Sequence, residues 1–260
     1  MNAPQHITSR DNALLVRLRR LAGEPAAYRK LGQVWLEGDH LCAALRSRGG
    51  QALQAVITED GWEQPALRDL AAWAPRVSIV PTALFKGIST LESPAALGFV
   101  MAVSQPDGIA AQMASVVLDR VQDAGNVGSI LRSAAAFGFG QVLAIKGTAS
   151  LWAPKVLRAG MGAHFGLRLL EGIDEADLAA LQVPLVATSS HAGAVLPTAV
   201  LPAPCAWVLG HEGQGVSAAL LARCALQVTI PQPGGEESLN VAAAAAVCLY
   251  ESAARRATSR

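Results

Sequence analysis

Cysteine and charged residues are scarce in this chain of 260 residues, and both shortages narrow its class. The four cysteines, Cys42, Cys205, Cys224 and Cys248, form no C-x-x-C pair and lie among apolar residues. This pattern predicts buried free thiols, not a disulfide framework or a metal site. Only 16% of the residues are charged and 52% are hydrophobic, so we expect a compact fold with little disorder beyond the ends.

Long hydrophobic runs are also missing. A bilayer-spanning helix needs about 18 or more consecutive apolar residues, and the apolar run at 241–250 is far shorter. The first residues contain no basic segment followed by an apolar core, so no secretory signal is predicted. These features predict a cytoplasmic protein without a membrane partner.

Three common ligand motifs are absent from the sequence. It has no G-x-x-x-x-G-K-[ST] phosphate loop, no G-x-G-x-x-G dinucleotide fingerprint and no H-E-x-x-H zinc motif. His211 and Glu212 are neighbours in the sequence, and their side chains need not meet. We therefore predict no metal site.

The net charge of +1 gives no overall sign of nucleic-acid binding. Residues 1–48 nevertheless carry eight basic against four acidic side chains. A solvated helix face and a phosphate-contacting surface both fit this excess. The candidate RNA-binding residues are Arg10, Arg17, Arg19, Arg20, Arg29 and Lys30.

Strand-like and helix-like segments alternate in both halves of the chain, which predicts α/β domains with largely parallel sheets. Turn-forming residues gather at 104–108, so the predicted domains are 1–105 and 106–260. In the first half, leucines at helical spacing with arginines between them predict an amphipathic helix over 9–22. In the second, we expect a helix over 126–137, with Asn126 as its cap.

Three loops in the second half carry the candidate chemistry, and each follows a predicted strand. They read N-x-G-x-x-x-R from Asn126 to Arg132, G-[polar]-E-G-x-G from Gly210, and I-P-x-x-G-x-x-x-S-L-N from Ile230 to Asn240. Ligands of open α/β sheets bind at the carboxyl ends of strands, so one shared site is expected. Taken singly, the loops also fit a partly buried structural arginine, a tight turn and an ordinary capped junction.

Together the three blocks resemble the signature motifs of the SpoU family of RNA ribose 2′-O-methyltransferases, in the SPOUT superfamily. Residues 155–165 are similar to the family segment between the first two motifs, and the resemblance covers 113–254. Residues 29–41 resemble, more loosely, the start of the family's ribosomal-protein-like α/β RNA-binding domain. The resemblance implies a parallel-sheet catalytic domain with a deep trefoil knot, bound S-adenosylmethionine and a homodimer.

The resemblance also implies roles for individual residues. Asn126, Arg132, Glu212, Ser238 and Asn240 would face the methyl group and the ribose, as the catalytic set. The cofactor would contact Leu209, Gly210, Gly213, Ile230, Pro231 and Leu239. A guanidinium stays protonated at ordinary pH, so we expect Arg132 to position the 2′-hydroxyl and an adjoining phosphate.

The substrate is less sharply defined by the sequence. The separate N-terminal domain favours ribosomal RNA over tRNA, while Glu236 and Glu237 add negative charge near a site that must receive RNA. A Rossmann-like methyltransferase would place its glycine loop after the first strand of the domain, whereas the richest loops here come late. A non-catalytic RNA-binding or ribosome-assembly factor with the same fold is the other alternative.

Overall fold

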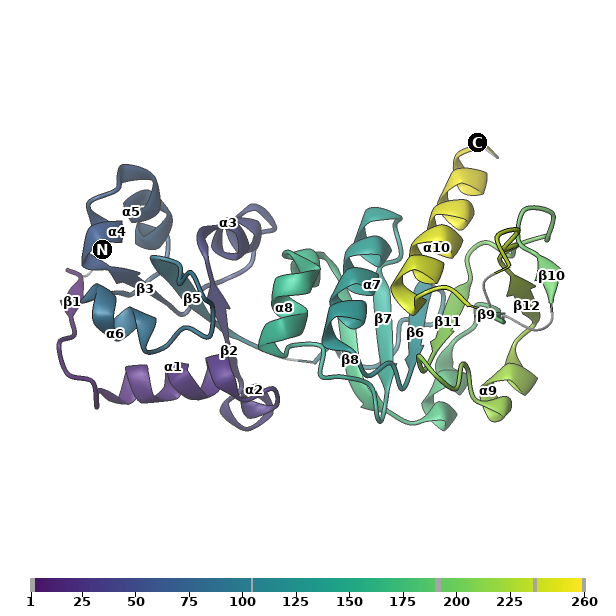
Figure 1. Ribbon diagram of the computed structural model, residues 1–260, viewed down its shortest axis with the longest axis horizontal. Helices are drawn as coiled ribbons and strands as arrows, with labels where there is room; N and C mark the ends of the chain where they lie inside the picture. The colour runs from purple at the N-terminus through teal and green to yellow at the C-terminus, as the bar shows by residue number, and fades with distance from the viewer. Residues whose placement is uncertain (1–2, 104, 190–192, 236–237, 259–260) are drawn as a thin grey trace. The chain divides into compact units, whose positions relative to one another are not determined.

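The computed structural model describes residues 3–258 except 104, 190–192 and 236–237 (Figure 1). The chain forms two compact units. Unit 1 contains 1–104 together with 152–165, and unit 2 contains 105–151 together with 166–260. Segment 152–165 thus groups with unit 1, although it lies within the second domain predicted from the sequence. The two units are described separately below.

Unit 1 is an α/β unit whose elements follow the predicted alternation closely. Its strands are β1 (Gln5–His6), β2 (Gln33–Glu37), β3 (Gln54–Thr58), β4 (Val77–Val80) and β5 (Leu97–Ala102). Its helices are α1 (Ala13–Gly23), α2 (Ala27–Leu31), α3 (Asp39–Ser47), α4 (Glu59–Trp62), α5 (Pro65–Ala72), α6 (Thr82–Lys86) and α8 (Pro154–Gly160). A short 3-10 helix, η1 (Ala163–Gly166), follows α8.

The five-stranded sheet of unit 1 has the order β1-β4-β3-β5-β2 and is mixed. The pairs β1–β4 and β3–β4 are parallel, whereas β5 runs antiparallel to both β3 and β2. The prediction of a largely parallel sheet is therefore wrong for this unit. The alternation of strands and helices did not reveal that β5 enters the sheet between β2 and β3 in the reverse direction.

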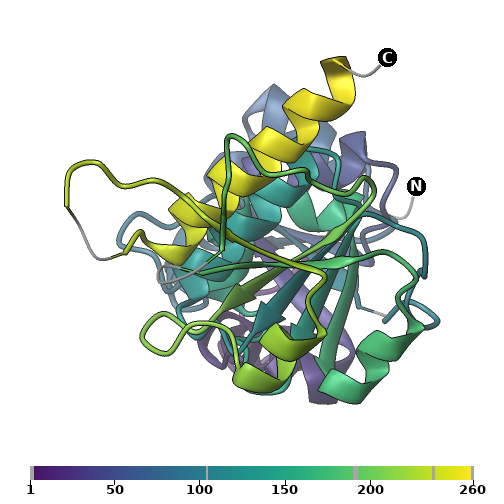
Figure 2. The same ribbon diagram turned by 90° about the vertical axis from the view of Figure 1, so that its right-hand side faces the viewer.

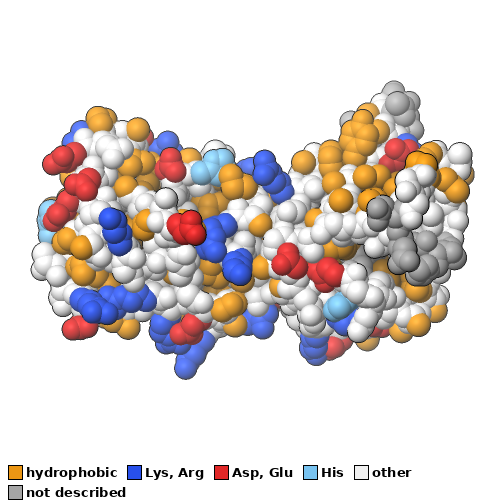
Figure 3. Space-filling view, in the orientation of Figure 1, with side chains coloured by type: hydrophobic (Ala, Val, Ile, Leu, Met, Phe, Trp, Pro, Cys, Tyr) orange, Lys and Arg blue, Asp and Glu red, His pale blue; other side chains and the backbone are white. Residues whose placement is uncertain are grey.

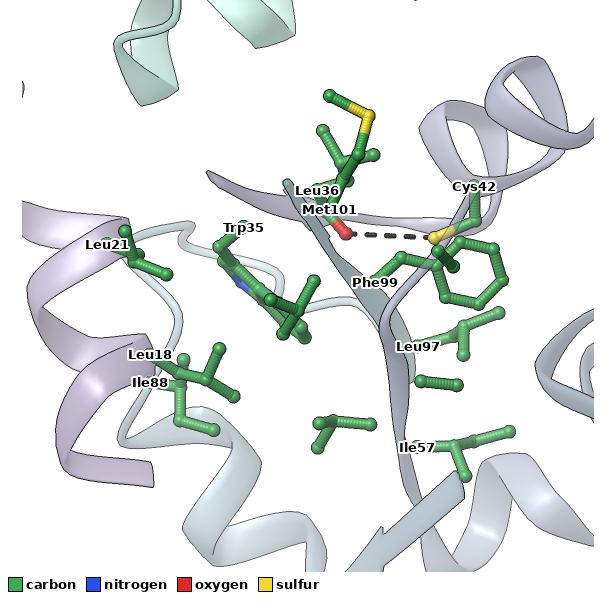
Figure 4. Packing of buried hydrophobic residues seen from close by; sticks show 14 of the residues in the cluster. Leu18, Leu21, Trp35, Leu36, Cys42, Ile57, Ile88, Leu97, Phe99 and Met101 are labelled. Carbon is green, nitrogen blue, oxygen red and sulfur yellow. Dashed lines mark hydrogen bonds between the residues drawn. The ribbon is translucent and has the colours of Figure 1, made fainter. Parts of the chain in front are cut away.

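The core of unit 1 lies between this sheet and its helices (Figure 4). The predicted leucine stripe of α1 is confirmed, because Leu15 and Leu18 are fully buried. Gly98 on β5 lies against the ring of Trp35, and an added Cβ there would come within 2.2 Å of it. Leu157 of α8 belongs to the same core, which explains why this late segment groups with unit 1.

Unit 2 is built around a second sheet. Its strands are β6 (Ser115–Asp119), β7 (Gln141–Ile145), β8 (Arg168–Ile173), β9 (Leu185–Thr188), β10 (Ala194–Val195), β11 (Ala206–Gly210) and β12 (Leu226–Thr229). Its helices are α7 (Ala124–Ala136), α9 (Ala218–Arg223) and α10 (Val241–Thr258), with a 3-10 helix η2 (Glu175–Ala180). The short strand β10 and the edge strand β8 were not predicted.

The seven strands of unit 2 have the order β10-β12-β9-β11-β6-β7-β8, and every pair is parallel. Figure 2 shows α7 and α10 on one face of the sheet and α9 on the other. Strands covered on both faces are apolar throughout, and β6, β7 and β11 are buried along their whole length. Strand order and pairing do not define how the chain threads, so the trefoil knot stays a prediction.

The four cysteines are free thiols, as predicted, and all but the half-buried Cys224 are buried. Burial raises the pKa of Cys205 to about 11 and that of Cys248 to about 12. Within the described ranges, no group of three or more His, Cys, Asp or Glu side chains is placed to hold a metal ion. In the same ranges, none of the helices has the length and hydropathy that a bilayer span requires.

Candidate functional site

The three predicted loops follow the carboxyl ends of β6, β11 and β12. Because these strands are parallel, the loops emerge at the same end of the sheet of unit 2, where its strands finish. The first loop enters α7 at Ala124, two residues earlier than predicted. Asp123, not Asn126, caps this helix, because its Oδ1 accepts a 2.7 Å hydrogen bond from the backbone N–H of Asn126. The side chain of Asn126 is therefore available for other contacts.

Glu212, in the second loop, ties that loop to the first. Its carboxylate accepts hydrogen bonds from the backbone N–H groups of Gln122 (3.2 Å) and Asp123 (3.1 Å) and from Nδ2 of Asn126 (3.1 Å). Partial burial acts to raise the pKa of Glu212, but the hydrogen bonds from Asn126 and the backbone outweigh it and lower the pKa. Glu212 is therefore an anionic anchor at neutral pH.

Asn240 brings the third loop into the same network. Its Nδ2 donates to Oδ1 of Asn126 at 3.0 Å, while its Oδ1 caps α10 by accepting from the N–H groups of Ala242 and Ala243. A carboxylate only accepts hydrogen bonds, so the NH2 group of the Asn126 side chain faces Glu212. The amide oxygen of Asn126 then faces Asn240. The chain Glu212–Asn126–Asn240 thus links all three motifs.

The second loop closes tightly on itself, and Gly210 makes this possible. A Cβ at Gly210 would come within 2.1 Å of the backbone of Gly215, so only glycine fits here. His211 and Gly215 exchange two backbone hydrogen bonds of 3.0 and 2.8 Å, and Nδ1 of His211 accepts from the N–H of Gly213 at 3.0 Å. These internal hydrogen bonds hold the loop in one compact turn.

The other predicted site residues differ in exposure. Arg132 is exposed on α7, which rules out the alternative of a partly buried structural arginine. No hydrogen bond or ion pair joins the side chain of Arg132 to any other residue that the structure describes. Ser238 and Leu239 are also exposed, and Leu239 retains 41% of its accessible surface.

The predicted cofactor residues divide between side chain and backbone. Pro231 and Gly213 are exposed and Ile230 is half-buried, so each is accessible to a ligand. The side chain of Leu209 is fully buried in the core, so any ligand contact from this residue would come from its backbone. Glu236 and Glu237, whose charge the sequence singles out, lie outside the described residues.

Most of the described polar side chains of the site are exposed at the surface of unit 2. Unit 2 does have a cavity of about 390 Å³, but it lies beside the start of β11 and is lined by Phe139, Pro204, Cys205 and Arg256 among others. None of the described residues of the three motif loops lines it. The chemistry of the site therefore rests on the exposed side chains and backbone groups of those loops.

Sequence reasoning missed several residues that hold the loops together. Asp119 is fully buried at the end of β6, and Arg120 after it has a positive φ of 58°. Arg120 contacts the second loop through Gln214, and Asp119 accepts from the N–H of Ser217, two residues beyond that loop. A charged pair directly after the apolar strand was the available signal.

The candidate RNA-binding residues lie on α1, α2 and the segment before α1, and Figure 3 shows Lys and Arg side chains gathered around α1 and α2. Arg10, Arg20, Arg29 and Lys30 are exposed, whereas Arg17 and Arg19 are half-buried. Among these residues, Arg19 donates to the backbone carbonyl of Arg10 at 2.6 Å. Arg20 pairs with Glu24 at 3.3 Å, which neutralises one of the exposed charges.

The fold and the loops define unit 2 as a parallel α/β unit with a polar site at its strand ends. The model of the SpoU rRNA Methylase family matches residues 113–250, a range that contains all three loops. The chain therefore belongs to the SpoU rRNA methylase family.

Relatives extend the likeness to most of the chain. The 23S rRNA (guanosine(2553)-2′-O)-methyltransferase RlmP of Bacillus subtilis is 32% identical over 221 residues, covering 83% of this chain and 86% of that protein. A putative RNA methyltransferase of the TrmH family from Porphyromonas gingivalis superposes with a TM-score of 0.82 at 30% identity, covering 94% and 98% of the two chains.

A third relative is known with a bound cofactor. The SpoU methyltransferase AviRb from Streptomyces viridochromogenes, in complex with AdoMet, superposes with a TM-score of 0.85 at 24% identity. The superposition covers 96% of this chain and 100% of that chain. At this identity the match supports the fold of both units.

Proposed function

We propose that this protein transfers a methyl group from S-adenosylmethionine to a ribose 2′-hydroxyl of ribosomal RNA. The observation that carries the proposal is the network Glu212–Asn126–Asn240, which joins the three family motifs at the carboxyl ends of the strands. The identity to RlmP, whose name specifies 2′-O-methylation of 23S rRNA, supports the reaction and the substrate class.

The residues of the loops suit S-adenosylmethionine. The absence of a side chain at Gly210 lets the second loop close tightly, and backbone groups at Gly210, Ile230 and Leu239 would meet the polar ends of the cofactor. The exposed side chain of Leu239 and the ring of Pro231 offer apolar surface for the adenine. When bound, the cofactor supplies an electrophilic methyl group on a sulfonium centre.

Within this proposal the polar residues have separate tasks. Glu212 already accepts three hydrogen bonds, so it holds the first two loops together and is not free to act as a general base. Arg132 has unused donors and a permanent charge, which suit an oxygen of the 2′-hydroxyl or of the adjoining phosphate. Ser238 and Asn240 complete the ribose-facing side.

Unit 1 would bind the RNA through its basic face, formed by Arg10, Arg17, Arg19, Arg20, Arg29 and Lys30. Lys and Arg side chains position RNA by contacting phosphates. The presence of a separate unit of this kind favours ribosomal RNA over tRNA. Since bacterial rRNA methyltransferases are among its relatives, we place the protein in the cytoplasm.

A homodimer is part of the proposal. Ala243, Val247 and Tyr250 form an exposed apolar stripe at helical spacing on α10, with Val247 retaining 42% and Tyr250 58% of its accessible surface. Tyr250 packs edge-on against Phe137, with ring centroids 5.7 Å apart, so the stripe continues toward α7. Figure 3 shows hydrophobic side chains along this helix. Val247→Asp is expected to yield monomers in light scattering, whereas a persistent dimer would exclude this stripe.

The direct test is transfer of labelled methyl from S-adenosylmethionine to total RNA from cells that lack the gene. We expect label in ribosomal RNA, recovered after alkaline hydrolysis in alkali-stable dinucleotides, because a 2′-O-methyl group blocks cleavage at that position. Label confined to tRNA would reverse the substrate assignment. Cofactor binding without transfer to any RNA would favour the non-catalytic RNA-binding factor.

A further inference from the structure

Strand β6 ends in an ion pair between the buried Asp119 and the half-buried Arg120, and neither the motifs nor the proposed chemistry uses it. Asp119 is fully buried, and the guanidinium of Arg120 donates to it through Nε (2.8 Å to Oδ1) and Nη2 (3.2 Å to Oδ2). The backbone N–H of Ser217 donates to the same carboxylate at 2.7 Å. Asp119 thus receives three hydrogen bonds, which compensate for the burial of its charge.

The third nitrogen group of Arg120 reaches the second loop. Its Nη1 donates to Oε1 of Gln214 at 3.2 Å. Gln214 lies within the tight turn that runs from Gly210 to Gly215, and its own side chain is exposed. The planar guanidinium therefore spans from the end of β6 to the loop that would carry the cofactor.

The backbone of Arg120 is held in a conformation that L-residues rarely adopt, with φ at 58°. Its N–H donates to Oγ1 of Thr148 at 3.1 Å, and that hydroxyl donates to the carbonyl of Leu118 at 3.0 Å. Gly147 leaves room for the side chain, because a Cβ there would come within 3.1 Å of Cγ of Arg120. Unfavourable backbone geometry persists only where surrounding contacts fix it, and these contacts aim the guanidinium at the second loop.

We propose that Arg120 is a positioning residue that holds the loop from Gly210 to Gly215 in the shape that binds the cofactor. It acts through Asp119 and Gln214 and does not touch the reacting atoms. The inference rests on the proposed function for its cofactor. Its structural half, the bracing of the loop, is testable without any ligand.

The kinetic test uses Gln214→Ala and Arg120→Lys. Gln214→Ala removes only the hydrogen bond that Arg120 donates to the loop and leaves the Asp119–Arg120 pair intact, while Arg120→Lys keeps a charge beside Asp119 but loses the planar, two-pronged guanidinium contact. For both we expect the KM for S-adenosylmethionine to rise about tenfold with kcat within about twofold, as when an interaction common to the ground state and transition state is removed. The KM of the double variant should not exceed the higher of the two single-variant KM values, because both substitutions break the same hydrogen bond.

A matched control separates this effect from general loosening. Gln182→Ala removes another exposed glutamine Oε1 of unit 2, which accepts a 3.3 Å hydrogen bond from Gln112 away from the motif loops. Its KM should match that of the wild type. An unchanged KM in Gln214→Ala and Arg120→Lys would overturn the proposal, as would a fall in kcat with KM unchanged.

Hydrogen exchange of the ligand-free protein gives the independent readout. The N–H of Gly215 is bonded to the carbonyl of His211 at 2.8 Å, and we expect its exchange to speed up about tenfold in Gln214→Ala. Amides of β7 should keep their wild-type rates. Unchanged exchange at Gly215 overturns the bracing role, whatever the cofactor result. If the wild type binds no S-adenosylmethionine, the proposed function fails while the exchange result still decides the bracing.

Discussion

Each of the two units is built on one sheet, but the two sheets use the ends of their strands differently. In unit 2 all strands are parallel, so the loops after β6, β11 and β12 lie at the same end of the sheet. Asn126 and Asn240 therefore meet although they are 114 positions apart in the sequence. In unit 1, β5 is antiparallel to β2 and β3, so the carboxyl ends of the strands are divided between the two ends of the sheet. Parallel alignment is thus what allows distant segments to build one site.

The two sheets contain polar contacts of two kinds. Each unit buries a hydrogen bond of 2.9 Å between side chains of neighbouring strands, Gln54–Ser78 in unit 1 and Gln141–Ser115 in unit 2. Unit 2 also places Asp119 and Arg120 at a strand end, where they reach a loop. The first kind of contact stabilises a sheet, whereas the second also fixes the shape of a functional surface.

The largest effect is expected at Arg132, the exposed cation of the strand-end site. Arg132→Ala should lower kcat about 100-fold, since it removes a charged donor to the reacting hydroxyl or phosphate, and should leave the Kd for S-adenosylmethionine nearly unchanged. Labelled methyl transfer and calorimetry measure the two quantities. Arg223→Ala, which removes another exposed arginine of unit 2, serves as the control. Near-normal turnover in Arg132→Ala would remove this residue from the mechanism.

Asn126 and Gln54 test the contrast between the units directly. Asn126→Ala breaks the link between Glu212 and Asn240, and we expect about tenfold weaker methyl transfer. Gln54→Ala leaves Ser78 without its partner and should cost about 1–3 kcal/mol of unfolding free energy while cofactor affinity stays at the wild-type value. Urea unfolding and calorimetry on both variants provide the comparison. A loss of cofactor affinity in Gln54→Ala would show that the units are not functionally separate.

The basic face of unit 1 should contribute affinity for RNA but not chemistry. Charge reversal at Arg10, Arg29 and Lys30, all exposed, should weaken RNA binding and reduce its salt slope by about one for each phosphate that is no longer neutralised. Filter binding at several salt concentrations measures both. Affinity equal to that of Arg223→Glu in unit 2 would mean that this face is only solvated.

The smallest effect concerns the pH dependence of stability. Because the pKa of Glu212 is below its usual value of 4.5 when folded, its contribution to stability is present above about pH 4.5 and is lost as pH falls through the lowered pKa. Glu212→Gln should therefore flatten the stability profile at acid pH. Urea midpoints across pH 3–7 test this, and parallel profiles for the two proteins would contradict it.

Much of the element order follows from the sequence, because apolar segments such as those ending at Asp119 and Gly210 are bounded by clear turn signals. The direction of β5 could not be predicted, since the residue pattern of a strand does not indicate whether its neighbours are parallel or antiparallel. The convergence of the motif loops was expected from strand ends. The roles of Asp123 and Arg120 were missed because capping and the bridge to Gln214 depend on exact loop geometry.

The central claim is that the three loops of unit 2 form one cofactor site, and a crystal structure of the protein soaked with S-adenosylmethionine tests it most directly. We predict electron density for the cofactor between the loops after β6, β11 and β12, in contact with the backbone of Gly210, Ile230 and Leu239. Density in the cavity beside Phe139 and Arg256 instead, with none between the loops, would contradict the account.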